Sequence, residues 1–87
     1  MDAIELLVRS LPAAAERIGR LYGCDLEFRG VCEDYRDCVV AQRRFARADP
    51  ARAEDYRRLA AELLAEVIEM LKAGRPGTPD LDRGIDR

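Results

Sequence analysis

The fold is decided by residues 28–70, FRGVCEDYRDCVVAQRRFARADPARAEDYRRLAAELLAEVIEM. Apolar residues recur every three and four positions on both sides of Asp49-Pro50, which predicts two amphipathic helices. Folding the chain back at this dipeptide pairs the apolar positions level by level: Phe45 with Ala53, Gln42 with Tyr56, Cys38 with Ala60, Tyr35 with Leu63, Val31 with Val67 and Phe28 with Met70. The pattern predicts an antiparallel helical hairpin, in which the polar pair Gln42 and Tyr56 fixes the register.

Outward from the hairpin, the sequence predicts three helices, at about residues 2–22, 25–47 and 50–73. Asp2, Asp25 and Asp49 precede these helices and are expected to cap their N-termini. Gly23 is expected to end the first helix in the left-handed conformation, and Gly30 to permit close approach of that helix to the second. Residues 1–74 are expected to form a single helical domain, followed by a mobile C-terminal tail at residues 75–87.

The N-terminal helix carries an apolar stripe that keeps its phase through Pro12. Proline interrupts the helical hydrogen-bond ladder, so either one kinked helix or two short helices fit the pattern. A kink or tight break that leaves both pieces on one surface is the favoured interpretation. The fold class we expect is therefore all-α, with a kinked N-terminal helix packed on a long antiparallel helical hairpin.

The apolar surface of the third helix is wider than a two-helix seam requires. This excess predicts a dimeric helical bundle, because a self-complementary apolar surface is buried well by a second copy. The candidate contacts with a partner or a second copy are Leu59, Leu64, Ile68 and Leu71. A compact three-helix monomer is the alternative.

Composition argues against catalysis and against bound cofactors. The 87 residues include three cysteines and no histidine, and the cysteines lack the close pairing of zinc ligands. Cys32 and Cys38 are expected to pack in the core, while Cys24 lies near a helix N-terminus where a reactive thiol is a minor alternative. The chain has no secretory signal and no apolar run long enough to cross a membrane. We expect a cytoplasmic protein with no enzymatic activity, no metal and no membrane contact.

The predicted hairpin turn is basic within a chain of formal net charge −2. Residues 42–58 contain six arginines against three carboxylates. Because guanidinium groups bind phosphate well, a possible phosphate-binding tip is formed by Arg43, Arg44, Arg47 and Arg52. The alternative is that Glu54 and Arg58 form an i, i+4 ion pair and that the remaining arginines are solvated or pair with the acidic end of a neighbouring subunit.

The hairpin sequence resembles the YdcH-like family of short bacterial helical-hairpin proteins. The resemblance is carried by residues 25–28, DLEF, with Tyr35 on the first arm, and by residues 63–71, LLAEVIEML, on the second. It covers about half of the chain, and the long N-terminal segment with Pro12 departs from the short leader of that family. The resemblance implies a small cytosolic hairpin that acts as an interaction module.

These observations favour a non-enzymatic protein–protein interaction module, an adaptor or regulatory helical bundle that binds itself as a homodimer and an unidentified protein. The alternative is a nucleic-acid-binding helical-hairpin dimer that uses the basic tip. The sequence pattern specifies shape more than chemistry, and it identifies no pathway.

Overall fold

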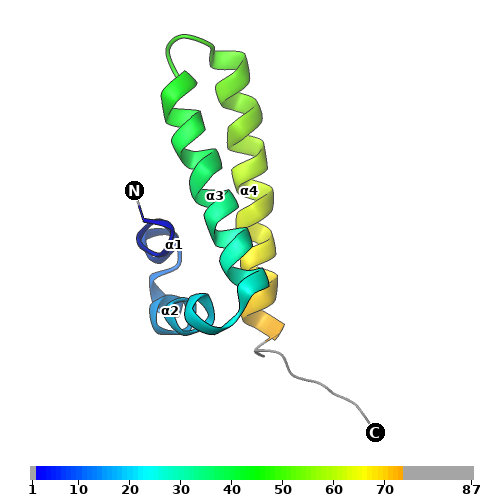
Figure 1. Ribbon diagram of the computed structural model, residues 1–87. Helices are drawn as coiled ribbons and strands as arrows, with labels where there is room; N and C mark the ends of the chain where they lie inside the picture. The colour runs from blue at the N-terminus through cyan, green and yellow to red at the C-terminus, as the bar shows by residue number, and fades with distance from the viewer. Residues whose placement is uncertain (1, 74–87) are drawn as a thin grey trace, which may run out of the picture.

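The computed structural model describes residues 2–73, and these residues form an all-α fold (Figure 1). The elements are α1 (Ala3–Ser10), the short 3-10 helix η1 (Pro12–Ala14), α2 (Ala15–Cys24), α3 (Leu26–Phe45) and α4 (Pro50–Ala73). The tail predicted at residues 75–87 lies outside the described residues. Within them, the predicted antiparallel hairpin is confirmed as α3 and α4, the most extensive helix pairing in the molecule.

The predicted N-terminal caps are confirmed at all three aspartates. The Asp2 carboxylate accepts a hydrogen bond from the Ile4 N–H, and the Asp25 carboxylate accepts one from the Phe28 N–H. At the hairpin turn, the Asp49 carboxylate accepts a hydrogen bond from the N–H of Arg52 at 3.1 Å. Each carboxylate satisfies a backbone donor that has no partner inside the helix and lies at the positive end of the helix dipole.

The N-terminal segment is broken rather than kinked. α1 ends at Ser10, Leu11 leaves the helical conformation with φ −133° and ψ 64°, and one 3-10 turn leads into α2. Proline excludes the helical conformation at the preceding residue and has no N–H to continue the ladder. The expected single helix over residues 2–22 is therefore two short helices, and the second of them continues to Cys24.

The two roles predicted for glycine are wrong. Gly23 lies inside α2, which is terminated by the extended backbone of Asp25 (φ −123°, ψ 107°). Gly30 lies in α3, but a methyl group added at its Cα would meet no atom within 4 Å. Neither glycine is required by a left-handed turn or by close packing of the described residues.

The core lies where α1, α2, α3 and α4 meet. Its completely buried side chains are Leu7, Ile18, Phe28, Cys32 and Val67, which come from all four α-helices. Complete burial of a leucine, isoleucine, valine or phenylalanine side chain contributes about 1.5–3 kcal/mol to the stability of the fold. The guanidinium of Arg17 in α2 also donates a 2.9 Å hydrogen bond to the carbonyl of Leu71, which ties α2 to the last turn of α4.

Near the turn, an aromatic contact that was not predicted joins the two arms of the hairpin. Phe45 stacks on Tyr56, with ring centroids 5.9 Å apart and ring planes 6° apart. Tyr56 was expected opposite Gln42, but no hydrogen bond joins these two side chains among residues 2–73. The facing of Gln42 and Tyr56 stays a prediction, while the stacked rings add an apolar contact between α3 and α4.

The N-terminal helices cover only part of the hairpin. Figure 1 shows α1 and α2 beside the lower half of α3, while the half nearer the turn at residues 46–48 projects beyond them. We call this projecting part the distal half of the hairpin. Among residues 2–73, no helix has the length and apolarity needed to cross a membrane.

Candidate functional site

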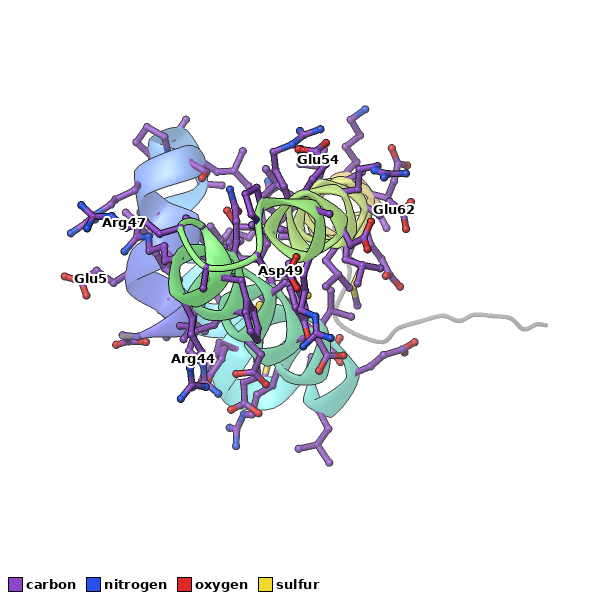
Figure 2. All side chains as sticks on the ribbon, turned by 90° about the horizontal axis from the view of Figure 1, so that it is seen from above. Glu5, Arg44, Arg47, Asp49, Glu54 and Glu62 are labelled. Atoms are coloured by element: carbon purple, nitrogen blue, oxygen red, sulfur yellow. The ribbon has the colours of Figure 1, made fainter. Side chains whose placement is uncertain are left out.

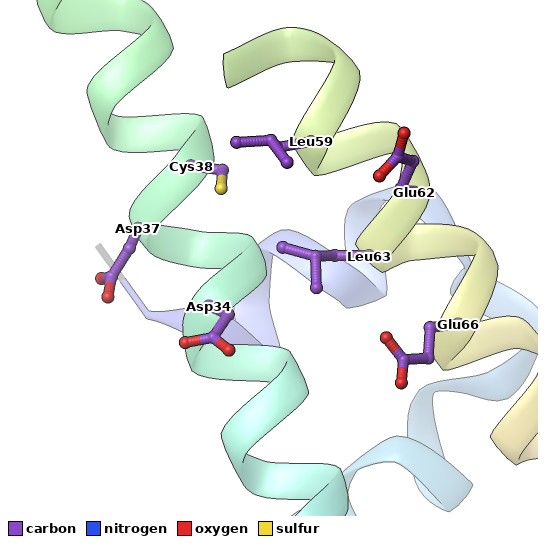
Figure 3. A pocket seen from close by; sticks show the side chains of 7 residues that line it. All are labelled: Asp34, Asp37, Cys38, Leu59, Glu62, Leu63 and Glu66. Carbon is purple, nitrogen blue, oxygen red and sulfur yellow. The ribbon is translucent and has the colours of Figure 1, made fainter. Parts of the chain in front are cut away.

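A groove of about 390 Å³ runs between α3 and α4 (Figure 3). Its apolar floor is made by Cys38, Leu59 and Leu63, and its rim carries the carboxylates of Asp34, Asp37, Glu62 and Glu66. Both helices contribute to the rim, two carboxylates each. We call this feature the acidic groove, and it is the candidate functional site because it joins an exposed apolar floor to a uniform charge.

The groove follows from the helical repeat of α4. Ala53, Ala60 and Val67 recur every seven residues and are buried against α3. At 100° per residue, Leu63 and Leu59 lie roughly 60° and 100° to one side of this buried stripe. They therefore remain at the edge of the seam, where Leu63 is half-buried and Leu59 is 47% exposed.

The N-terminal helices leave this edge of the seam open. In Figure 3, α1 and α2 lie behind the hairpin as seen from the groove, and their main contacts are with α3. A leucine with 47% of its surface exposed is ordinary when it is isolated. Here Leu59 belongs to a concave apolar strip with Cys38 and Leu63.

The carboxylates of the groove are only partly neutralised. Asp37 accepts both of its hydrogen bonds from Arg36 on one oxygen, Oδ1, at 3.1 and 2.9 Å. In the part of the chain that the structure describes, Glu62 and Glu66 have no ion-pair partner. The rim therefore presents negative charge on both sides of the apolar floor.

The three cysteines are free and occupy different environments. Burial, and to a smaller extent the neighbouring carboxylate of Glu33, raise the pKa of the Cys32 thiol to about 12. Burial also raises the pKa of Cys38, with additional contributions from Asp34 and Asp37. Both thiols are therefore protonated near neutral pH, which agrees with the packing role predicted for them, although Cys38 is half-buried and lies in the groove.

The four predicted contact residues, three leucines and one isoleucine, do not form one surface. Leu59 lies in the acidic groove, whereas Leu64 and Ile68 fall roughly 40° and 80° to the other side of the buried stripe of α4. Leu64 packs against the core, and Ile68 is half-buried. Leu71 is only 6% exposed and belongs to the core, so its prediction as a partner contact is wrong.

The arginines of the predicted phosphate-binding tip are divided by the turn. Arg44 and Arg47 are exposed, and among residues 2–73 neither has an ion-pair partner. Figure 2 shows both side chains pointing away from α4. Arg43, on the same helix as Arg44, is also exposed. Arg52 instead lies against its own helix cap, 3.8 Å from the Asp49 carboxylate, with its guanidinium 5.0 Å from the centre of the Phe45 ring.

Ion pairs within α4 neutralise the remaining charge near the tip. Arg57 donates hydrogen bonds to Glu54, and Arg58 pairs with Asp55 at 3.3 Å. The hydrogen bond from Arg57 lowers the pKa of the Glu54 carboxyl. The structure therefore leaves the net positive charge of the turn on the α3 side.

Two features of the site were not predicted from the sequence. One is the acidic groove itself, whose four carboxylates come from two different helices. The other is the stacked pair of Phe45 and Tyr56 near the turn, in which the Phe45 ring also contacts the guanidinium of Arg52. The i, i+3 and i, i+4 spacing of Leu59, Glu62, Leu63 and Glu66 was the available signal for the groove.

Comparison of the chain with protein-family models, curated protein sequences and solved structures gave no match. The resemblance to the YdcH-like hairpins stays a prediction. Within the described range, 2–73, no three Cys, Asp or Glu side chains are grouped so that they could hold a metal ion. The site is therefore interpreted from its own geometry, which is that of an open helix–helix groove.

Proposed function

We propose that this protein is a non-enzymatic protein–protein interaction module and that the acidic groove is its binding surface. The observation that carries the proposal is the exposure of Leu59 beside Cys38 and Leu63 in a concave strip between two helices. Cys38 and Leu63 also pack against the core, whereas Leu59 is 47% exposed and lies outside it. Grooves of this kind receive the apolar face of a partner helix.

The absence of a cofactor and of catalysis is part of the same proposal. The groove holds carboxylates and a thiol of raised pKa, but it is open along its length and brings no histidine or activated nucleophile to them. Acid–base and nucleophilic catalysis require such groups at hydrogen-bond distance in a site that excludes water. Binding requires only shape and charge.

Self-association and a cytoplasmic location complete the proposal. A homodimer would cover an exposed apolar side chain outside the acidic groove, namely Leu26 on α3, which is 81% exposed. The free thiols of Cys24, Cys32 and Cys38 are compatible with a reducing compartment, in which disulfides are rare. Sedimentation of the purified protein measures self-association, and fractionation of cells measures the location of the protein.

The test uses the protein as bait in an extract of its native cells, with nuclease added. We expect a stoichiometric protein partner that is captured by the wild type and lost with Leu59→Gln. The matched control is Val40→Gln, which changes another exposed apolar residue, on α3 outside the acidic groove. Equal capture by the wild type and Leu59→Gln would refute the groove as the binding surface.

A nucleic-acid-binding hairpin is the second candidate, and one observation favours it. Arg44 and Arg47 are exposed on the α3 side of the turn without ion pairs among residues 2–73. If they bind phosphate, the Arg44→Glu/Arg47→Glu variant loses affinity for a labelled oligonucleotide, and the wild-type affinity falls steeply with salt. Unchanged affinity in that variant would remove this candidate.

A further inference from the structure

We propose that the partner received by the acidic groove is a cationic amphipathic helix, with lysine or arginine on both flanks of an apolar stripe. This inference rests on the proposed function and specifies the chemistry of the partner. It depends on two independent properties of the groove, its shape and the sign of its charge.

The shape of the groove fits a third helix. Two antiparallel helices leave a furrow along each side of their seam, and among residues 2–73 this furrow is lined by α3 and α4 alone. A helix laid in such a furrow completes a bundle, with its side chains between those of the two existing helices. From Leu59 to Glu66 the furrow extends about 10 Å along α4, so roughly two to three turns of a partner helix would fill it.

The apolar floor specifies an apolar stripe on that helix. Leu59 and Leu63 lie one turn apart on α4, and Cys38 faces them from α3. Because facing ridges repeat every three to four residues, the partner should present apolar side chains at i, i+3 or i+4, and i+7. An extended peptide is a poorer fit, since α3 and α4 offer it no unpaired backbone groups.

The rim specifies the charge of the flanks. Asp34 and Asp37 border the floor on the α3 side, and Glu62 and Glu66 border it on the α4 side. An apolar helix with acidic flanks would be repelled on both sides, whereas Lys or Arg at these flanks would pair with carboxylates. On the α3 side, Asp34 is the carboxylate open to such a pair, because Asp37 is hydrogen-bonded to Arg36 and points away from Leu59 and Leu63 in Figure 3.

The same charges disfavour a second copy in a face-to-face arrangement. Two acidic grooves brought together by a two-fold axis would place four carboxylates against four others. Like charges in contact at an interface cost several kcal/mol and select against the wrong partner. Nucleic acid is disfavoured at this surface for the same reason.

The experiment uses fluorescein-labelled peptides and the full chain at physiological salt. The probe is a 14-residue amphipathic helix of leucine and lysine, and its matched control replaces every lysine by glutamate. We expect the lysine peptide to raise fluorescence anisotropy in a saturable way and the glutamate peptide to leave it unchanged.

Variants then locate the binding. Glu62→Lys/Glu66→Lys should lower the affinity for the lysine peptide by at least about tenfold, and Leu59→Gln should lower it by a similar factor. The matched control, Glu5→Lys/Glu16→Lys, makes the same change of net charge on α1 and α2, at exposed positions outside the groove. It should bind within about threefold of the wild type, and circular dichroism checks that each variant is folded.

Four outcomes would overturn the inference. Equal loss in the two double lysine variants would mean non-specific attraction, and binding of the glutamate peptide would contradict the charge argument. A wild-type dimer that dissociates in Leu59→Gln would assign the groove to a second copy. If a cellular partner is lost with Leu59→Gln while the lysine peptide fails to bind, the proposed function stands and only the cationic partner is refuted.

Discussion

Gly30 is a residue of low helix propensity in the interior of α3. It lies in α3, exposed, with no atom within 4 Å of the position where a methyl group would be added. Glycine in a helix interior costs about 0.5–1 kcal/mol relative to alanine. No contact among the described residues explains its presence there.

We therefore predict that Gly30→Ala raises the free energy of unfolding by about 0.5–1 kcal/mol. Urea denaturation followed by circular dichroism measures this change. Gly19→Ala in α2 is the matched control, because its environment is equally open and a gain of the same sign is expected. A decrease in stability for Gly30→Ala would show that another part of the protein approaches α3 closely.

The three thiols give a second prediction at the scale of residues. At pH 8 we expect iodoacetamide to modify Cys24 first, because it is exposed, then Cys38, and Cys32 only when the protein unfolds. The thiolate is the reactive species, and burial raises the pKa of both Cys32 and Cys38. Mass spectrometry of the time course measures the order.

The raised pKa of Cys32 also determines how the free energy of unfolding changes with pH. Because the pKa of Cys32 is about 12 in the fold and about 9 when unfolded, its protonated form is favoured by folding. This contribution to stability is complete below pH 9 and is lost as the pH rises from about 9 to about 12. Modification of Cys32 at the same rate as Cys24 at pH 8 would contradict the buried position of Cys32.

Among the helices, α4 depends on a cap that the sequence identified. Asp49 directly precedes Pro50, the first residue of α4, and its carboxylate accepts a hydrogen bond from the N–H of Arg52. We predict that Asp49→Ala lowers the free energy of unfolding by about 1 kcal/mol, whereas Asp49→Asn keeps most of the stability because an amide oxygen also caps a helix. Urea denaturation of both variants measures the difference, and equal losses would assign the effect to charge alone.

The hairpin could be predicted from the sequence because its determinants are local. The repeat of apolar positions and the Asp49-Pro50 turn act within their own helices, and the caps at Asp2 and Asp25 follow the same logic. The break at Pro12 was left open between a kink and two helices, since both keep Ile4 and Ile18 on one surface. In the structure, Leu11 leaves the helical conformation directly before Pro12, which separates α1 from α2.

At the scale of the whole molecule, the site was not predictable because it depends on where α1 and α2 pack. On α4 alone, Leu59 and Leu64 flank the buried stripe on opposite sides, and the sequence does not distinguish them. Packing on the core at Leu64 leaves the furrow at Leu59 open. The same packing buries Leu71, which the width of the apolar stripe had marked as a contact.

The central claim is that the acidic groove is the surface by which this protein binds a partner helix. The most direct test is a two-dimensional NMR titration of the isotope-labelled chain with the leucine–lysine peptide. The account predicts that amide shifts concentrate at residues 34–38 and 59–66, with little change in α1, α2 or the turn at residues 46–48. Shifts centred on the turn, or spread evenly over the acidic surface of the protein, would contradict it.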